Sequence, residues 1–190
     1  MHIIDCKGLA CPKPVINTKK YFDSIENGAA QVIVDNEIAK NNILKLANSN
    51  NIESNFEFKD NLFIINLKKV GNIEKKINED TNVILIGKDK LGDGNDTLGT
   101  ALMKSYIYAL SESDKKPTHL LFLNGGVKLT IEDSEVLESL KILQNAGVEI
   151  LSCGTCLDFY GIKEKVAIGE ITNMYNIVEV MNNAKNTISL

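Results

Sequence analysis

A polar stretch at residues 68–82 interrupts the apolar pattern of this 190-residue chain and limits the folds that are open to it. The stretch has no continuous apolar face, so it is a poor candidate for a packed element. Before it, the pattern predicts strand, helix, strand, helix and two strands, whereas after it strands and helices alternate. The interruption therefore favours two α/β domains, at residues 1–70 and 82–190, joined by a linker at residues 71–81.

The first domain is predicted to contain both strands and helices. Apolar runs predict its strands, at residues 2–5, 31–34, 55–59 and 62–67. One helix is expected at residues 12–26 and another after the cap residue Asn36. Asp60-Asn61 suits a two-residue hairpin turn, although it has no glycine. The residues expected to face the core are Val15, Thr18, Phe22 and Ile25 in the first helix and Ala39, Ile43, Leu46 and Ala47 in the second.

The second domain repeats strand and helix units, which favours a parallel sheet covered by helices on both faces. Its strands are predicted at residues 83–86, 118–123, 148–151 and 166–168. One helix is expected at residues 96–110, one between a cap at Asp133 and a stop at Gly147, and one after a cap at Asn173. The residues expected to face the core are Leu98, Ala101, Leu102, Tyr106 and Ala109, then Val136, Leu137, Leu140 and Leu143, then Met174, Ile177, Val178 and Met181.

The charge pattern argues against nucleic acid as a partner. The net charge is -4, lysines are mixed among acidic residues, and 6% of the residues are aromatic. Proteins that bind nucleic acid usually carry a basic stripe, and those that bind single strands also use aromatic stacking. The first residues lack the features of a signal peptide, and no apolar run approaches the roughly 20 residues of a membrane span. We therefore expect a cytoplasmic protein with no membrane contact, whose partners are small thiols or other proteins.

The cysteines fall into two pairs along the sequence, Cys6 with Cys11 and Cys153 with Cys156. In a reducing compartment such thiols stay free, so their placement carries more information than their number. Cys6 is expected to be an inert buried thiol. The alternative is that it resolves an adduct on Cys11 by forming a disulfide.

The placement of Cys11 favours a reactive thiol. Proline is preferred at the first helical position, so Pro12 predicts that Cys11 is the helix cap. Free N–H groups and the helix dipole would then lower the pKa of the thiol from its reference of about 8.5. Lys7 and Lys13 would add positive potential, and Gly8 would allow a tight turn near the sulfur. The alternative is that Cys11 is a small buried residue that precedes a proline by chance.

The string Asp5-x-x-Gly8-x-x-Cys11-Pro12-x-Pro14, followed by a helix, resembles the TusA-like (SirA-like) sulfur-carrier family over residues 1–70. This resemblance implies a two-layer α/β sandwich with the element order βαβαββ. It also implies that Cys11 carries persulfide sulfur between proteins. Asp5, Gly8, Pro12 and Pro14 would shape the turn that holds this cysteine.

The segment Cys153-Gly154-Thr155-Cys156 follows the third predicted strand of the second domain, and doubly wound sheets gather ligands at the carboxyl ends of strands. Four interpretations are open. The pair could bind zinc, which needs two further ligands, or form a redox dithiol, although the order of elements does not match a thioredoxin fold. The thiols could also be inert packing residues or a second site for a chalcogen. The further zinc ligands could come only from Cys6, Cys11, His2 and His119.

Other polar features of the second domain are given structural roles. Gly92-Asp93-Gly94 lacks the lysine and spacing of a P-loop and the complete glycine pattern of a dinucleotide site, so we interpret it as a turn. His119 is expected to pack within an apolar strand. Asp158, Tyr160 and Lys163 are interpreted as ordinary surface residues near the cysteines.

Residues 83–185 resemble a DsrE-type domain. The likeness rests on Gly92-Asp93-Gly94 after the first strand, on Asn124-Gly125-Gly126-Val127 after the second and on the cysteine segment after the third. It implies a loop cysteine that accepts sulfur, with Cys153 the closer positional match and Cys156 nearly as close, and it implies a homo-oligomer. The two domains in this order resemble the selenium-metabolism proteins of the YedF type.

Together these features predict a carrier that holds sulfur or selenium as a persulfide-type adduct on Cys11, with Cys153 and Cys156 as a relay site. A cysteine desulfurase or a reduced selenium species would load the thiol, and an acceptor protein would take the adduct. No cofactor and no metal are expected. Two alternatives stay open. A regulatory binding module would keep its function in Cys11→Ser, and a dithiol oxidoreductase would use the C-terminal pair.

Overall fold

The structure is a computed structural model that describes residues 2–10, 12–71 and 81–190. The chain divides into two compact units, residues 1–76 and 77–190, and each unit has its own hydrophobic core. Both units are α/β, as the sequence predicts. Most of the predicted linker lies outside the described residues. Among the helices of the described ranges, none is both long and apolar enough to cross a membrane.

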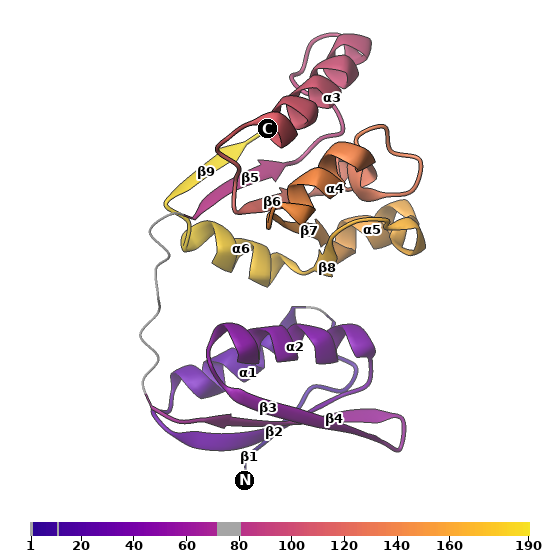
Figure 1. The fold of residues 1–190 in the computed structure, drawn as a ribbon. Coiled ribbons are helices and arrows are strands. Elements are labelled where there is room, and N and C mark those ends of the chain that lie inside the picture. Colours follow the sequence, from indigo (N-terminus) through magenta and orange to yellow (C-terminus); the bar gives the residue numbers. More distant parts are fainter. Residues whose placement is uncertain (1, 11, 72–80) are drawn as a thin grey trace. The chain divides into compact units, whose positions relative to one another are not determined.

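The first unit is a two-layer α/β sandwich, which confirms the fold that the TusA-like resemblance implies. Its elements are β1 (His2–Asp5), α1 (Lys13–Asp23), β2 (Gly28–Val34), α2 (Glu37–Ser49), β3 (Glu53–Lys59) and β4 (Leu62–Lys69). The strands form a mixed sheet in the order β1-β2-β4-β3, with both helices on one face (Figure 1). β1 and β2 are parallel, and the other neighbours are antiparallel.

Helix α1 begins one residue later than the sequence predicts. Pro12 occupies the cap position and Lys13 is the first helical residue. Proline is tolerated there because the first N–H groups of a helix have no partner within the helix. Cys11 therefore precedes the cap position instead of occupying it, which corrects the predicted placement. Of the predicted core residues, Val15, Thr18 and Phe22 are buried, whereas α1 ends at Asp23 and Ile25 lies beyond its end and is partly buried.

Helix α2 and the hairpin follow their predictions. The Asn36 side-chain oxygen accepts the N–H of Ala39 at 2.8 Å and so caps α2. Asp60 and Asn61 have left-handed φ angles of 52° and 62°, as a two-residue hairpin turn requires. Both residue types tolerate this backbone, so the turn forms without glycine. The predicted core residues Ala39, Ile43, Leu46 and Ala47 are buried.

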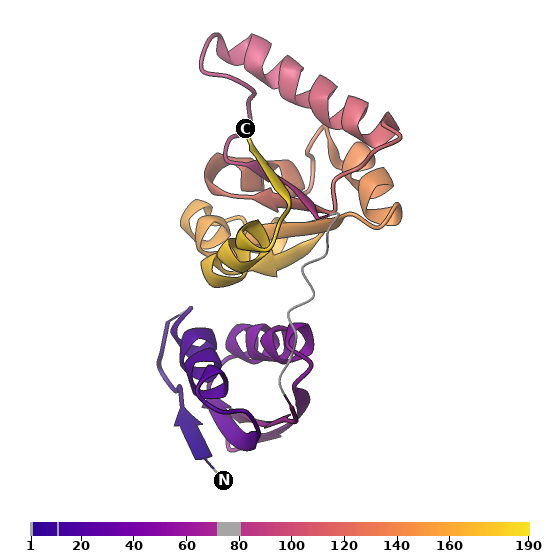
Figure 2. The same ribbon diagram turned by 90° about the vertical axis from the view of Figure 1, so that its left-hand side faces the viewer.

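The second unit is a parallel sheet covered on both faces, as the sequence predicts. Its elements are β5 (Asn82–Ile86), α3 (Asp96–Glu112), β6 (His119–Phe122), η1 (Asn124–Thr130), α4 (Leu137–Asn145), β7 (Glu149–Cys153), α5 (Gly154–Tyr160), η2 (Lys163–Lys165), β8 (Glu170–Thr172), α6 (Met174–Asn182) and β9 (Asn186–Ser189), where η marks a short 3₁₀ helix. The order is β8-β7-β6-β5-β9, and all neighbouring strands are parallel. Right-handed crossovers place α3 and α4 on one face and α6 on the other (Figures 1 and 2).

Two strands of this sheet differ from the prediction. The fourth strand is β8, whereas the predicted segment 166–168 contributes an isolated bridge between Val166 and Ile131. β9 was not predicted. The side chains of β9 are exposed, and its sequence has no apolar run that would predict a strand. The segment joins the sheet through backbone pairing with β5.

The start of α4 also differs from the prediction. Val136 occupies the cap position, and Asp133, the predicted cap, has a left-handed φ of 66° in the turn before it. The end of α4 is as predicted. Gly147 has a φ of 92°, and the N–H of Val148 donates to the carbonyl of Leu143 at 3.0 Å, which is the Schellman pattern. The buried residues of this segment are Val136, Leu140 and Leu143.

Helix α3 turns a different face to the core from the one predicted. Its buried residues are Gly99, Met103, Ile107 and Ser111. Of the residues predicted to face inward, Tyr106 is partly buried, and Leu98, Ala101, Leu102 and Ala109 are exposed. A Cβ at Gly99 would lie 3.3 Å from the carbonyl oxygen of Leu91, so the helix approaches the preceding loop closely at this point. Both faces have helical spacing, and periodicity alone does not choose between them.

The cap of α6 is confirmed, since the Asn173 side chain accepts the N–H of Asn176 at 3.1 Å. The predicted core face is only partly correct. Ile177 is fully buried, whereas Met174 and Val178 are 48% and 45% exposed. The helix therefore packs on a narrower stripe than its apolar content suggests.

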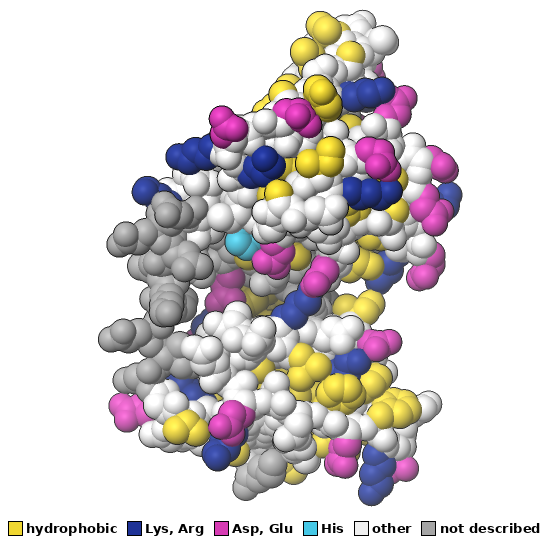
Figure 3. Space-filling view, viewed as in Figure 1, with side chains coloured by type: hydrophobic (Ala, Val, Ile, Leu, Met, Phe, Trp, Pro, Cys, Tyr) yellow, Lys and Arg dark blue, Asp and Glu magenta, His cyan; other side chains and the backbone are white. Residues whose placement is uncertain are grey.

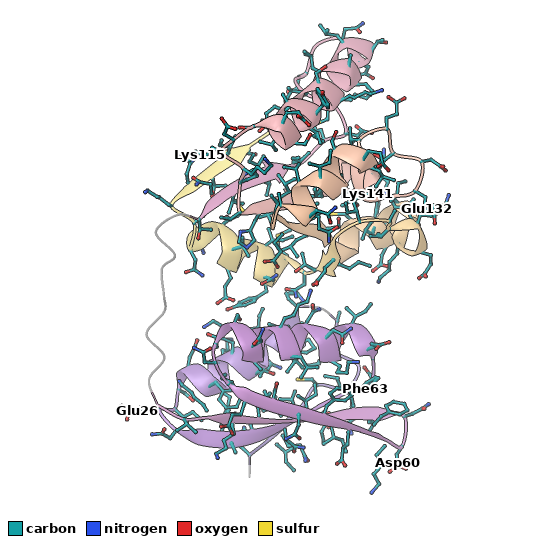
Figure 4. All side chains as sticks on the ribbon, in the orientation of Figure 1. Glu26, Asp60, Phe63, Lys115, Glu132 and Lys141 are labelled. Carbon is teal, nitrogen blue, oxygen red and sulfur yellow. The ribbon has the colours of Figure 1, made fainter. Side chains whose placement is uncertain are left out.

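An apolar patch stays exposed on the first unit. Phe56 and Phe58 on β3 are 47% and 59% exposed, and Figure 3 shows hydrophobic side chains gathered on this unit. Phe63 on β4, labelled in Figure 4, packs against Phe58 with ring centroids 4.7 Å apart. The Lys40 ammonium lies 4.8 Å and 5.0 Å from the ring centroids of Phe56 and Phe63. Its cation–π contacts cover part of the patch.

Candidate functional site

The two C-terminal cysteines lie where β7 passes directly into α5. Cys153 is the last residue of β7 and also the cap position of α5, and Cys156 lies in the first helical turn. The predicted cysteine loop is therefore a junction of strand and helix. This junction is at the carboxyl edge of the parallel sheet, where ligands of such folds bind. The loops that follow β5 and β6 meet it there.

Cys153 is almost completely buried, with 2% of its surface exposed. Burial raises the pKa of the Cys153 thiol to about 11, because the charged form loses its hydration. A side-chain hydrogen bond with Cys156 acts in the same direction, and the backbone N–H groups of Cys156 and Thr155 act against it. The thiol is therefore protonated at neutral pH.

Cys156 is partly exposed, and its sulfur has a backbone donor. The N–H of Asn124, the first residue of η1, donates to the Cys156 sulfur at 3.2 Å. Asn124 has a left-handed φ of 44°, which asparagine tolerates better than most residues. This contact fixes the Cys156 sulfur beside the first residue of η1. Cys156 is thus the accessible thiol of the pair.

Tyr160 holds the neighbouring loop in place. It lies one helical turn after Cys156, and its hydroxyl donates to the side-chain oxygen of Asn124 at 2.8 Å. The Lys128 ammonium lies 4.7 Å from the Tyr160 ring centroid and 3.7 Å from a carboxylate oxygen of Asp89. Tyr160 is therefore not an ordinary surface residue, because this chain of contacts connects α5, η1 and the loop after β5 at the sheet edge.

Glycines allow the loops to approach the strands. A Cβ on Gly126 would lie 2.1 Å from the carbonyl oxygen of Ile86, so no other residue fits there without a shift of the backbone. A Cβ on Gly154, between the cysteines, would lie 3.1 Å from the Ile171 side chain and 3.3 Å from the carbonyl oxygen of Thr172. Gly126 therefore fixes η1 against β5, and with it the position of the N–H that meets Cys156.

A small cavity lies beside these contacts. Its volume is about 230 Å³, and Asp89 and Lys128 belong both to its wall and to the contacts around Tyr160. Ligand pockets usually measure about 300–1,000 Å³, so this cavity suits a small molecule at most. The other lining residues are Thr100, Met103, Lys104, Leu129, Ser134, Glu135 and Val136.

The turn before Cys11 is fixed by two carboxylates of the first unit. Gly8 has a left-handed φ of 68°, and its N–H donates to Asp35 at 2.6 Å. The N–H of Lys7 donates to Asp5 at 3.1 Å. These backbone hydrogen bonds lower the pKa of Asp35 and of Asp5, because they favour the charged carboxylates. Asp35 was not anticipated, since it is far from Gly8 in sequence.

The remaining residues predicted for this site are placed as follows. Cys11 lies outside the described residues. Pro14 is buried in the first turn of α1, and Lys13 is exposed. Cys6 is 1% exposed, and burial raises the pKa of its thiol. Pro12 is partly exposed at the cap position.

Other polar residues take structural positions. Asp158 and Lys163 form an ion pair at 2.8 Å. His119, at the start of β6, is partly buried, and its ring nitrogen lies 3.2 Å from a Glu149 carboxylate oxygen. The Gly92-Asp93-Gly94 segment is an exposed turn, in which Asp93 pairs with Lys88. Among the residues that the structure describes, no three His, Cys, Asp or Glu side chains gather as a metal site.

Comparisons with known proteins assign both units. The family model described as Sulfurtransferase TusA matches residues 2–69, and the model of the DsrE/DsrF-like family matches residues 100–190. Comparison with curated proteins finds no match.

Solved structures include similar chains. A SirA-like protein from Desulfitobacterium hafniense is 32% identical, and the match covers 37% of this chain and 99% of that one with a TM-score of 0.36. The ychN protein from E. coli is 16% identical, with 58% and 99% covered and a TM-score of 0.46. A protein of unknown function from Methanobacterium thermoautotrophicum is 19% identical, with 58% and 100% covered and a TM-score of 0.44.

The two family matches place the protein in the sulfur-relay class, with a sulfurtransferase role. More particularly, the chain belongs to the TusA family over residues 2–69 and to the DsrE/DsrF-like family over residues 100–190. Both resemblances that the sequence motifs suggest are thereby confirmed.

Proposed function

We propose that this protein is a chalcogen carrier that accepts sulfur or selenium as a persulfide-type adduct and passes it to an acceptor protein. The accepting thiols are Cys11 in the first unit and Cys156 in the second. The environment of Cys156 carries the proposal, because this thiol is partly exposed and its sulfur accepts the N–H of Asn124. Cys153 is the closer positional match to the family cysteine, but it is too buried to meet a donor protein.

Loading is a thiol exchange in which the accepting thiolate attacks the terminal sulfur of a donor persulfide. A bond forms between the cysteine sulfur and the terminal sulfur, and the sulfur–sulfur bond of the donor breaks. The donor leaves as a thiolate, so charge and electrons balance without a further reagent. The same exchange serves a terminal selenium atom. A cysteine desulfurase is the proposed donor, since it presents such a persulfide.

The first unit supports the same role through the turn that precedes Cys11. Asp5 and Asp35 accept backbone N–H groups of this turn, and Gly8 supplies its left-handed backbone. A turn held by such contacts is ordered before a donor arrives, which lowers the entropy lost on docking. We propose that this order positions Cys11 for attack.

Selenium metabolism is the proposed setting. The order of a TusA-type domain followed by a DsrE-type domain is the order of the YedF-type proteins that the sequence resembles. Sulfur and selenium share thiolate chemistry, so the choice of element belongs to the donor and acceptor proteins. The homo-oligomer that a DsrE-type domain implies stays a prediction, which sedimentation velocity would test.

The test is mass spectrometry of intact protein and peptides after incubation with a cysteine desulfurase and either L-cysteine or L-selenocysteine. We expect one adduct on the Cys11 peptide and one on the peptide that contains Cys153 and Cys156. Cys11→Ser should lose the first adduct and Cys156→Ser the second. Cys6→Ser removes the buried thiol in the turn before Cys11, and both adducts should remain in it. An absence of adducts with both substrates would exclude the carrier function.

The same variants separate the alternatives. A dithiol oxidoreductase, favoured by the contact between Cys153 and Cys156, would show a reversible disulfide and no adduct on any cysteine. A regulatory binding module would keep its cellular function in Cys11→Ser and in Cys156→Ser. Loss of chalcogen delivery to an acceptor in these variants supports the carrier instead.

A further inference from the structure

The buried thiol of Cys153 has no part in loading, yet its side chain interacts with that of Cys156. We propose that Cys153 is a resolving residue, which attacks an adduct on Cys156 and releases the terminal chalcogen as hydrosulfide or hydroselenide. A disulfide between Cys153 and Cys156 remains. This inference rests on the proposed loading of Cys156, and it gives the second unit an activity that the carrier function does not require.

The geometry of the junction supports this attack. Cys153 is the extended cap residue of α5 and Cys156 is the third helical residue, and closure of a disulfide brings their Cβ atoms to about 3.5–4.5 Å through a shift of either residue. The backbone of Cys153 is held by pairing with Thr172 in β8. Cys156 lies in the first turn of the short helix α5. The shift therefore falls on α5, while the sheet keeps its register.

Burial determines which of the two thiols reacts first with a donor. A donor protein or an external thiol meets Cys156, which is partly exposed, before it can meet Cys153, which is 2% exposed. An adduct on Cys156 therefore has its terminal atom on the accessible side and its inner sulfur next to Cys153. The inner sulfur is the atom at which attack expels the terminal chalcogen.

The reaction balances as a single exchange. The Cys153 sulfur forms a bond to the Cys156 sulfur, and the bond between the Cys156 sulfur and the terminal chalcogen breaks. The terminal atom leaves with the electron pair and takes the proton of the Cys153 thiol, so it is reduced while Cys153 is oxidised. A small or protein dithiol then reduces the disulfide and restores both thiols.

Protonation of Cys153 fits this sequence of events. Burial keeps the pKa of this thiol at about 11, so it holds its proton until an adduct forms beside it. A neutral thiol is a weak nucleophile, and it does not compete with Cys156 for the donor. Its attack depends on proximity, which raises the effective concentration of an intramolecular thiol far above that of thiols in solution.

The experiment uses the full chain with Cys11→Ser, so that only the second site carries an adduct. The protein is loaded by a cysteine desulfurase with L-cysteine, separated from the enzyme and followed for hydrosulfide release and for the mass of the Cys153–Cys156 peptide. We expect one hydrosulfide for each disulfide formed. Adding Cys153→Ser should preserve the adduct and slow release by on the order of a hundredfold or more. Cys153→Ala repeats the test, with circular dichroism to verify folding.

Each outcome decides the inference. If an adduct forms on Cys156 but release is equal with and without Cys153, the inference is wrong and the carrier function stands. If no adduct forms on Cys156 even when Cys153→Ser is added, both fail at this site. A separate titration of the unloaded protein in glutathione redox buffers should close the same disulfide. A pair that never closes, in a folded protein, also overturns the proposal.

Discussion

Burial of a single thiol makes the stability of the second unit depend on pH in the alkaline range. The folded state raises the pKa of Cys153 from an ordinary value of 9.0 to about 11, so folding favours the protonated form. Its contribution is fully present below pH 9 and is lost as the pH rises towards 11. We expect the free energy of unfolding to fall by about 2–3 kcal/mol more in wild type than in Cys153→Ala over this window. Urea unfolding at fixed pH values, followed by circular dichroism, measures the difference, and parallel curves would contradict it.

A second prediction at this scale concerns Asp35, which accepts the N–H of Gly8. Asp35→Ala should leave this N–H without its partner, speed hydrogen exchange at Gly8 and slow the loading of Cys11. In wild type the same hydrogen bond lowers the pKa of Asp35, so the turn should loosen as the pH falls below the ordinary value of 3.8. Asp23→Ala removes an exposed carboxylate that pairs with Lys19 and serves as the control. Equal Gly8 exchange in both variants would refute the role of Asp35.

Side chains with intrinsic reactivity were easier to predict than the groups around them. Cys153 and Cys156 stand out in the sequence because thiols have few structural uses in a reducing compartment. The donor to Cys156 is a backbone N–H of Asn124, and its signal was confined to the Asn-Gly-Gly segment after a predicted strand. Lys128 and Asp89 gave no signal, because their contacts depend on how separate loops meet at the sheet edge.

At the scale of elements, the sequence correctly predicted the features that depend on contacts between residues close together in the chain. The caps Asn36 and Asn173, the stop at Gly147 and the Asp60-Asn61 turn all depend on residues within a few positions of one another. The buried face of α3 depends instead on the loop that packs against Gly99. β9 depends on an edge of the sheet that exists only after the other strands have assembled. Neither feature is encoded in its own segment.

The packing of η1 on β5 gives a prediction for a whole element. Gly126→Ala would force the Ile86 carbonyl and η1 apart, since the added Cβ has no room. We expect a loss of about 3 kcal/mol in stability, the upper end of the usual cost of overpacking, together with slower loading of Cys156. Gly94→Ala is the control, because a Cβ there meets no atom within 4 Å and stability should change by less than about 0.5 kcal/mol. Thermal and urea unfolding test both, and similar losses in the two variants would argue against the contact.

At the scale of the whole molecule, the two cores share no buried residue, so each unit should fold alone. We expect residues 1–71 and 81–190, expressed separately, to unfold cooperatively at the temperatures of the two transitions of the full chain. Differential scanning calorimetry of the three proteins measures this. An unfolded fragment, or one transition of the full chain that neither fragment reproduces, would show that the units depend on each other.

The pairing of β9 with β5 has a consequence for biosynthesis. β5 spans residues 82–86 and its partner β9 spans residues 186–189, so the ribosome must make about a hundred further residues before β5 gains this neighbour. The first unit needs no strand beyond residue 69 and can fold while the rest is still being made. During that interval the folded TusA-type domain would already be exposed to donor proteins, before β9 completes the sheet of the second unit.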